Sequence, residues 1–364
     1  MGIIGLPGSG KSALFNALTR LGSSGGRSTA ATVPVPDERL QVLAGMVKPK
    51  RLVPAGVQFV DVSGLAKGGA KEGGLGGQFL NQLQAVSALA IVLRCFAYPD
   101  LGFGVEPAQP LADLESILLE LQLSDLARIE RRLERVTKMA RQRDVAAQRE
   151  EQTLIALRVA LNEGRLARGV GITESEAAAL KDLGLLTLKP LILVANIGEE
   201  DLGPAANPAL PDPNDIRATL AGLEAAAREN GAEVAIVSAR LESELTELEE
   251  ADATEYLTSL GIENTGIERF IAAAYRELGV LTFLTAGEPE VRAWTVRQGS
   301  KAPEAAGTIH SDIERGFIRV EVTPYELLVQ AGNPAKAKEL GYTRLEGKEY
   351  VMQEGDVVYF RFNV

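Results

Sequence analysis

The chain has 364 residues, of which 46% are hydrophobic, and its formal net charge is −11. Its length predicts two or three domains with a large core. Its acidity excludes a protein whose whole surface is a nucleic-acid footprint, although a local basic patch is compatible with it. A single cysteine, Cys95, excludes an internal disulfide framework and favours a reducing, cytoplasmic setting. We see no signal peptide and no apolar run long enough to span a bilayer, so no membrane association is expected.

The chain begins with a phosphate-binding pattern. Residues 5–12 read Gly-Leu-Pro-Gly-Ser-Gly-Lys-Ser, between a short apolar run and a segment with helical spacing. A strand, a glycine loop and a helix in that order predict a nucleoside triphosphate site, where Lys11 reaches the β- and γ-phosphates and Ser12 ligates Mg²⁺. The residues expected to bind the nucleotide here are Gly8, Ser9, Gly10, Lys11, Ser12 and Ala13.

A second acidic motif follows the next predicted strand. The apolar run 57–62 ends in Asp61-x-x-Gly64, which predicts that Asp61 holds Mg²⁺ and that the Gly64 amide faces the γ-phosphate. We therefore assign Lys11 and Gly64 to catalysis. The glycine-rich residues 64–80 are a candidate switch, and a plain surface loop is the alternative.

Residues 111–186 have helical spacing. Apolar residues at three- and four-residue steps predict two antiparallel helices with a bend between Arg141 and Ala147, and a single long helix is the alternative. Basic residues outnumber acidic ones on this arm, which makes it either a candidate RNA-binding face or an ordinary solvated surface. These basic residues are Arg128, Arg131, Arg132, Arg135, Lys138, Arg141 and Arg143.

Strands and helices then alternate, which predicts an α/β fold with a parallel sheet. Ligands bind such sheets at the carboxyl ends of the strands, and there stand Asn196-Ile197-Gly198-Glu199 and Ser238-Ala239. We expect Asn196, Ile197, Glu199, Ser238 and Ala239 to join the phosphate-binding loop in one site. From about Leu281 alternating strands predict a small β-rich domain. It holds the only histidine, His310, which is expected to be structural.

Together these motifs resemble the YchF-type, or Obg-like, ATPases. Further matching runs are 33–40 (Val-Pro-Val-Pro-Asp-Glu-Arg-Leu), 291–295 (Val-Arg-Ala-Trp-Thr), 302–312 and 355–364. The resemblance covers nearly the whole chain. It implies a P-loop NTPase sheet at 1–110 and 189–279, a coiled-coil insert at 111–188 and a C-terminal β-grasp, TGS-like domain at 280–364.

The resemblance also implies an activity: slow, Mg²⁺-dependent ATP hydrolysis by a nucleotide-dependent switch associated with the ribosome or translation machinery. Guanine-specific relatives carry N-K-x-D, whereas Asn196–Glu199 lacks the lysine and has a longer acid, so adenine is expected, read partly near Ile197. Thr32 or Thr29 is expected to complete the Mg²⁺ shell. Ribosome or RNA contact is expected through the arm and the TGS-like domain, and no DNA partner is expected.

Two departures bear on mechanism. Leu65 stands where Ras-like enzymes place a water-orienting glutamine, which predicts slow intrinsic hydrolysis. Gly8 replaces the family's usual asparagine, so potassium activation is not carried over to this chain. Two other functions stay open: a nucleotide-gated adaptor with incidental turnover, and a GTPase with a relaxed base motif.

Overall fold

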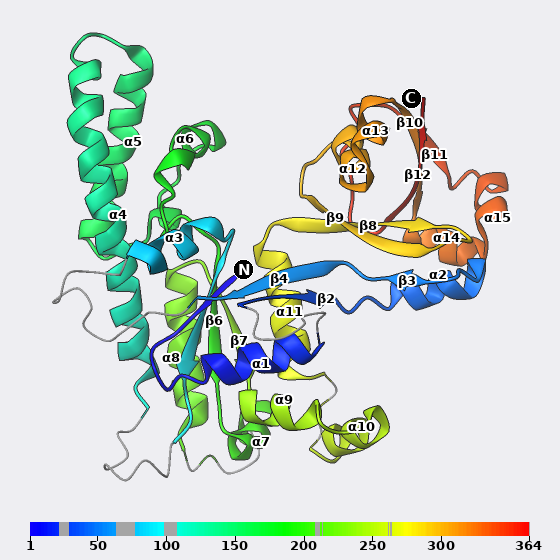
Figure 1. The fold of residues 1–364 in the computed structure, drawn as a ribbon, viewed down its shortest axis with the longest axis horizontal. Helices are drawn as coiled ribbons and strands as arrows, with labels where there is room; N and C mark the ends of the chain where they lie inside the picture. Colours follow the sequence, from blue (N-terminus) through cyan, green and yellow to red (C-terminus); the bar gives the residue numbers. More distant parts are fainter. Residues whose placement is uncertain are drawn as a thin grey trace. The chain divides into compact units, whose positions relative to one another are not determined.

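The computed structural model describes residues 1–21, 29–62, 77–97, 108–207, 212, 214–260, 262 and 264–363. The chain divides into two compact units (Figure 1). Unit 1 comprises Met1–Ala31 and Gln58–Ala273, and unit 2 comprises Thr32–Val57 and Ala274–Val364. Residues 32–57, which the sequence analysis assigned to the nucleotide-binding domain, thus group with the C-terminal segment, while the boundaries at 110, 188 and 279 stay predictions.

Unit 1 is an α/β fold. Its sheet has the order β2-β4-β1-β5-β6-β7, and β1 pairs in parallel with β4 and β5, as do β5 with β6 and β6 with β7. The central strands β5 and β6 are almost continuously apolar and buried, which is typical of parallel strands covered on both faces. The strands are β1 (Gly2–Ile4), β2 (Ala30–Pro34), β4 (Gly56–Asp61), β5 (Leu89–Arg94), β6 (Leu191–Asn196) and β7 (Glu233–Val237).

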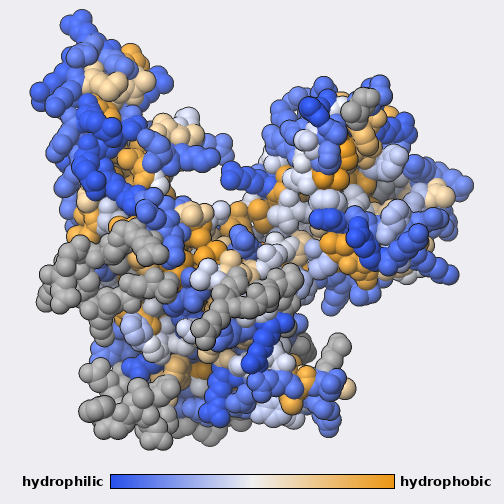
Figure 2. Space-filling model, viewed as in Figure 1, coloured by the Kyte–Doolittle hydropathy of each residue, from blue (hydrophilic) through white to orange (hydrophobic). Residues whose placement is uncertain are grey.

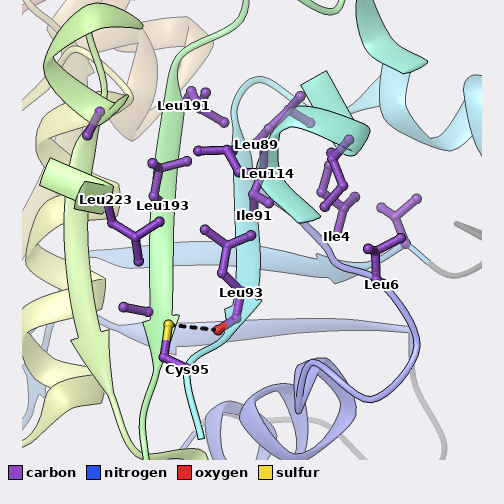
Figure 3. Packing of buried hydrophobic residues seen from close by; sticks show 14 of the residues in the cluster. Ile4, Leu6, Leu89, Ile91, Leu93, Cys95, Leu114, Leu191, Leu193 and Leu223 are labelled. Atoms are coloured by element: carbon purple, nitrogen blue, oxygen red, sulfur yellow. Dashed lines mark hydrogen bonds between the residues drawn. The ribbon is translucent and has the colours of Figure 1, made fainter. Parts of the chain in front are cut away.

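Helices cover this sheet. Figure 3 shows Leu89, Ile91 and Leu93 of β5 packed with Leu191 and Leu193 of β6 and with helix residues. The other helices of unit 1 are α1 (Lys11–Leu21), α3 (Gly77–Ala85), α6 (Glu174–Ala179), α7 (Leu202–Ala206), α8 (Ile216–Glu229), α9 (Ala239–Leu245), α10 (Glu250–Ser259) and α11 (Gly266–Glu277), which runs on into unit 2, with short 3-10 turns at Ala167–Gly169, Lys181–Leu183 and Glu199–Asp201.

The predicted arm is a helical hairpin of α4 (Pro110–Ala140) and α5 (Val145–Asn162). Its helices are antiparallel: near the base Gln122 donates to the Gly164 carbonyl oxygen at 2.8 Å, and near the tip Thr137 donates to Glu151 at 2.6 Å. The prediction of two helices is confirmed. A buried apolar seam joins them, formed by Ile129, Leu133, Val136, Ala140, Leu154, Leu157 and Leu161.

The hairpin turns without glycine or proline. Arg143 adopts the left-handed conformation, with φ of 64°. Asp144 then caps α5, because its carboxylate accepts hydrogen bonds from the amides of Ala146 at 2.9 Å and Ala147 at 3.1 Å. The bend lies within the predicted range 141–147.

Unit 2 is built on a second sheet, of order β11-β10-β12-β8-β9-β3. β8 and β9 form an antiparallel hairpin, and β12 runs parallel to β8 and antiparallel to β10, with α12 packed on the sheet. This is a β-grasp arrangement. Its elements are α2 (Arg39–Val47), β3 (Leu52–Val53), β8 (Val280–Ala286), β9 (Val291–Arg297), α12 (Ala302–Ile309), α13 (Ser311–Arg315), β10 (Phe317–Pro324), α14 (Tyr325–Ala331), α15 (Pro334–Glu339), β11 (Arg344–Glu346) and β12 (Asp356–Phe362).

His310 has the structural role predicted for it: its Nδ1 accepts a hydrogen bond from the Asp312 amide at 3.1 Å and caps α13. Among the described residues, none of the helices is both long enough and apolar enough to span a membrane.

Candidate nucleotide-binding site

The phosphate-binding loop connects β1 to α1. Gly8 and Gly10 have φ values of 80° and 85°, which residues other than glycine rarely adopt. An added Cβ at Gly10 would lie 2.0 Å from Nδ2 of Asn196. The backbone therefore favours glycine at both positions, and at Gly10 the close approach of Asn196 also excludes a side chain.

Lys11, the first residue of α1, forms an ion pair with Asp61 at the end of β4. β1 and β4 are neighbouring parallel strands, with Ile3 opposite Asp61, so the two sequence motifs meet at the same sheet edge. Both side chains are largely buried, at 13% and 23% exposed. The structure thus brings together two of the residues predicted for phosphate and metal binding.

A cavity of about 860 Å³ opens above this edge of the sheet. Every residue predicted to bind the nucleotide, except Ser238, lines this cavity. The cavity is lined by Gly5, Leu6, Pro7, Gly8, Ser9, Gly10, Lys11, Ser12, Ala13, Phe96, Ala97, Asn196, Ile197, Gly198, Glu199, Glu200, Ala239, Arg240, Ser243 and Glu244.

Asn196 links three parts of the cavity wall. Its Nδ2 donates to the carbonyl oxygen of Ser9 at 2.9 Å, and its Oδ1 accepts from the amide of Ala239 at 2.9 Å. Asn196 is 3% exposed, and neighbouring Ser238 is 1% exposed with a hydroxyl that has no partner among the described residues. The side chain of Asn196 therefore fixes the spacing between the phosphate loop and the 238–239 turn.

The other two residues of the predicted base motif have different environments. The Ile197 amide donates to the Val237 carbonyl oxygen at 2.9 Å, so this amide extends the hydrogen bonding between β6 and β7. Glu199 lies on the cavity wall, where its carboxylate accepts a hydrogen bond from the hydroxyl of Tyr256 on α10.

Sequence reasoning missed several residues of this site. Phe96, which lines the cavity just beyond β5, could have been found by the rule that located Asn196, because it follows the end of a parallel strand. Arg240 and Glu244 are one helical turn apart on α9 and form an ion pair at 3.0 Å. Nothing in the sequence pointed to Tyr256, which lies 57 residues beyond Glu199 along the chain.

Some predicted residues are not brought into this cavity. Asp61 pairs with the cavity residue Lys11 but is not itself on the cavity wall. Thr29 lies beside Asp61, since its carbonyl oxygen accepts the Asp61 amide at 2.8 Å, whereas Thr32 belongs to unit 2; both threonines are exposed. Thr29 is therefore the better candidate for the Mg²⁺ shell. Gly64, Leu65 and the rest of the glycine-rich segment up to residue 76 lie outside the described residues.

The donor set fits a magnesium ion bound with a nucleotide. Within the described ranges no cluster of three or more His, Cys, Asp or Glu side chains could hold a metal alone. The Asp61 carboxylate and the Ser12 hydroxyl supply hard oxygen donors, and Mg²⁺ commonly combines one or two such ligands with substrate phosphates.

Burial raises the pKa of the Cys95 thiol, beside Phe96, to about 12, which leaves that thiol protonated at neutral pH.

The basic residues of the hairpin fall into two groups. Arg132 pairs with Glu150 at 2.6 Å, which joins α4 to α5, and with Asp182 at 3.0 Å. Arg128 donates to the Leu183 carbonyl oxygen at 2.9 Å, so both arginines also tie α4 to the turn 181–183. The others are exposed, on a hairpin whose visible surface is mostly hydrophilic (Figure 2). The exposed members are Arg131, Arg135, Lys138, Arg141 and Arg143.

Comparison with known proteins agrees with this geometry. A family model described as "50S ribosome-binding GTPase" matches residues 1–140, and the YchF-GTPase_C model, described as "Protein of unknown function (DUF933)", matches residues 280–363. The chain is 45% identical to "Ribosome-binding ATPase YchF" of Bacillus subtilis and 40% identical to that of Escherichia coli O157:H7, covering 100% of this chain and 99% of each relative.

A solved structure described as "Structure of the Schizosaccharomyces pombe YchF GTPase" superposes with a TM-score of 0.87 at 31% identity, covering 99% of this chain and 97% of that one. The similarity therefore extends over both units, and the chain belongs to the YchF family.

Proposed function

We propose that this protein is a Mg²⁺-dependent ATPase that binds the ribosome and acts there as a nucleotide-dependent switch. The observation that carries the proposal is the meeting of three motifs: the phosphate loop and Asn196 line one cavity and are joined by a hydrogen bond, and Lys11 of the loop forms an ion pair with Asp61. The bacterial relatives named above, each called a ribosome-binding ATPase, support the activity and the partner.

In this proposal the chain catalyses phosphoryl transfer to water mainly by charge neutralisation and positioning. Lys11 and the amides of the loop bind the β- and γ-phosphates, and the N-terminus of α1 adds partial positive charge. Asp61, Ser12 and Thr29 would hold Mg²⁺, which supplies further charge neutralisation when bound. From the sequence motif, the Gly64 amide is assigned to the γ-phosphate, and leucine at position 65 offers no side-chain hydrogen bond to the attacking water, so slow intrinsic hydrolysis is expected.

ATP is preferred because the base motif has lost the features that select guanine. Asn196 keeps a structural role, Ile197 replaces the lysine whose stem packs on guanine, and Glu199 is engaged by Tyr256. Phe96 contributes an aromatic ring to the cavity wall, where a purine of either kind could stack. Selection against guanine therefore comes from the hydrogen-bonding edge of the base.

We assign ribosome contact to the exposed basic residues of the hairpin and to the β-grasp, TGS-like part of unit 2, and with it we propose a cytoplasmic location. The hairpin offers exposed arginines and a lysine at helical spacing, which suits phosphate groups along an RNA backbone.

The decisive experiment measures the dissociation constants of ATP and GTP with Mg²⁺ on the full chain, alongside turnover with and without ribosomes. Tighter ATP binding with ribosome-stimulated turnover is the expected result. Tighter GTP binding would make the protein a GTPase, as the fission-yeast relative is called. Turnover that stays slow with ribosomes while binding depends on nucleotide would indicate an adaptor.

A further inference from the structure

The carboxylate of Glu199 is held from outside the cavity. Glu199 stands at the acidic position of the base motif and lines the cavity, whereas Tyr256, which donates to it, lies on α10 and is not part of the cavity wall. The hydrogen bond takes one of the two carboxylate oxygens, Oε1.

This arrangement matters because of what a guanine edge demands. Guanine presents two neighbouring donors, N1–H and the 2-amino group, which a carboxylate accepts through both of its oxygens. Adenine presents an amino donor beside an acceptor nitrogen, so it gains little from two carboxylate oxygens. A site that hydrogen-bonds a base discriminates strongly against one that leaves its polar groups unpaired.

We propose that Tyr256 is a positioning residue for nucleotide specificity: by donating to Oε1 it fixes the orientation of the Glu199 carboxylate, so that its two oxygens do not both turn toward the two donors of a guanine base. The proposal deepens the ATP preference proposed above and rests on the same cavity. In this proposal Tyr256 acts through Glu199, the cavity residue to which its hydroxyl donates.

The surroundings of the pair keep it in this state. The hydrogen bond to Glu199 raises the pKa of Tyr256, so its hydroxyl stays protonated and remains a donor at neutral pH. Arg240 on α9 is paired with Glu244 at 3.0 Å, which is the main cause of its raised pKa, and the charge of Glu199 adds to this more weakly. Glu200 folds back on the backbone, since its carboxylate would lie 2.5 Å from a Cβ at Gly198. In the described structure the hydroxyl of Tyr256 therefore donates the hydrogen bond that orients Glu199.

The test replaces the hydroxyl alone. For wild type and Tyr256→Phe, the dissociation constants of ATP, GTP and inosine triphosphate are measured with Mg²⁺. Releasing Glu199 should lower the ratio of the GTP constant to the ATP constant about tenfold, the worth of one hydrogen bond to a charged group. Inosine triphosphate lacks the 2-amino group and should gain clearly less than GTP, a difference that a general loosening of α10 would not produce.

Two controls isolate the contact. Tyr359→Phe removes a hydroxyl from a 67% exposed tyrosine of unit 2 and should leave both constants at their wild-type values. Tyr256→Phe combined with Glu199→Gln should lose the gain, because an amide offers one acceptor oxygen instead of two. A gain that survives in this double variant would overturn the role of Glu199.

The proposed function and this inference fail separately. The wild-type ratio tests the preference for ATP, whereas the change in the ratio on Tyr256→Phe tests the role of Tyr256, whichever nucleotide the wild type prefers. An unchanged ratio in Tyr256→Phe overturns the inference even if ATP binds more tightly. A wild type that prefers GTP overturns the ATPase proposal even if the ratio shifts.

Discussion

Nδ2 of Asn196 donates a hydrogen bond to the carbonyl oxygen of Ser9, so the base motif is joined directly to the phosphate-binding loop. The same side chain accepts from the amide of Ala239. Asn196 thus acts first as a buried connector between loops at the ends of β1, β6 and β7, and its contribution to nucleotide binding comes from holding those loops in register.

Asn196→Ala should therefore affect both stability and binding. It leaves the Ser9 carbonyl and the Ala239 amide without a partner in a buried place, which should cost about 2–4 kcal/mol in the free energy of unfolding and weaken ATP binding at least tenfold. Urea unfolding and calorimetric titration measure the two effects. Asn162→Ala, at an exposed helix position, is the control and should change neither. A variant of wild-type stability would contradict the connector role.

Lys11→Ala should abolish hydrolysis and weaken triphosphate binding more than diphosphate binding, because Lys11 is the cation proposed to reach the β- and γ-phosphates. It also removes the partner of the largely buried Asp61. Single-turnover hydrolysis and equilibrium binding of ATP and ADP check this. Lys336→Ala, an exposed lysine in unit 2, serves as the control. Retained turnover in Lys11→Ala would remove the phosphate-loop assignment.

Replacing glycine by alanine should reduce stability and ATP binding by different amounts at the two loop positions. At Gly8 an added Cβ meets nothing within 4 Å, so Gly8→Ala should cost only the backbone strain of φ 80°, about 1 kcal/mol. Gly10→Ala adds a clash with Nδ2 of Asn196 to similar strain and should be several-fold worse for stability and for ATP binding. Parallel unfolding and binding measurements decide it, and equal effects at both positions would refute the close approach of Asn196.

Removing exposed positive charges from the hairpin should weaken ribosome or RNA binding without lowering the stability of the fold. Arg131, Arg135 and Lys138 are exposed and share one face at helical spacing. Replacing all three by alanine should weaken ribosome or RNA binding and flatten its dependence on salt, with little change in stability. Arg132→Ala, which breaks pairs to Glu150 and Asp182, should instead lower stability. If the triple variant binds the ribosome as the wild type does, this face of the hairpin is a solvated surface only.

Local pattern was enough to predict most of unit 1. The buried strands, the phosphate loop and the antiparallel hairpin each have a signature within a few residues, and the capping residue Asp144 marks the start of α5. Two features had no such signature. Residues 32–57 join unit 2 through packing of Leu40 and Leu43 with residues near 290 and 330, and Tyr256 reaches Glu199 across the fold. Both depend on tertiary contacts, which a single sequence does not reveal.

Glu242 gives unit 1 a stability that depends on pH. It lies buried on α9, and its Oε1 accepts the Ile267 amide of α11 at 3.1 Å. Burial raises its pKa to about 7, opposed by backbone hydrogen bonds from Ile267 and Gly266; nearby Glu268 raises it further and Arg269 lowers it. A carboxyl whose pKa is higher in the folded than in the unfolded state stabilises the fold while it is protonated. Its contribution is full below the unfolded value of about 4.5 and is lost as the pH rises through about 7.

Glu242→Gln should remove this dependence, because the amide keeps an acceptor for Ile267 and carries no charge at any pH. Between pH 4.5 and 8 the free energy of unfolding of the wild type should fall relative to that of the variant, by up to about 3 kcal/mol for a pKa difference of this size. Urea unfolding of both proteins at several pH values measures the difference, with the exposed Glu224→Gln on α8 as the control. Curves for wild type and Glu242→Gln that run parallel across this range would show that Glu242 ionises in the folded protein as it does in the unfolded chain.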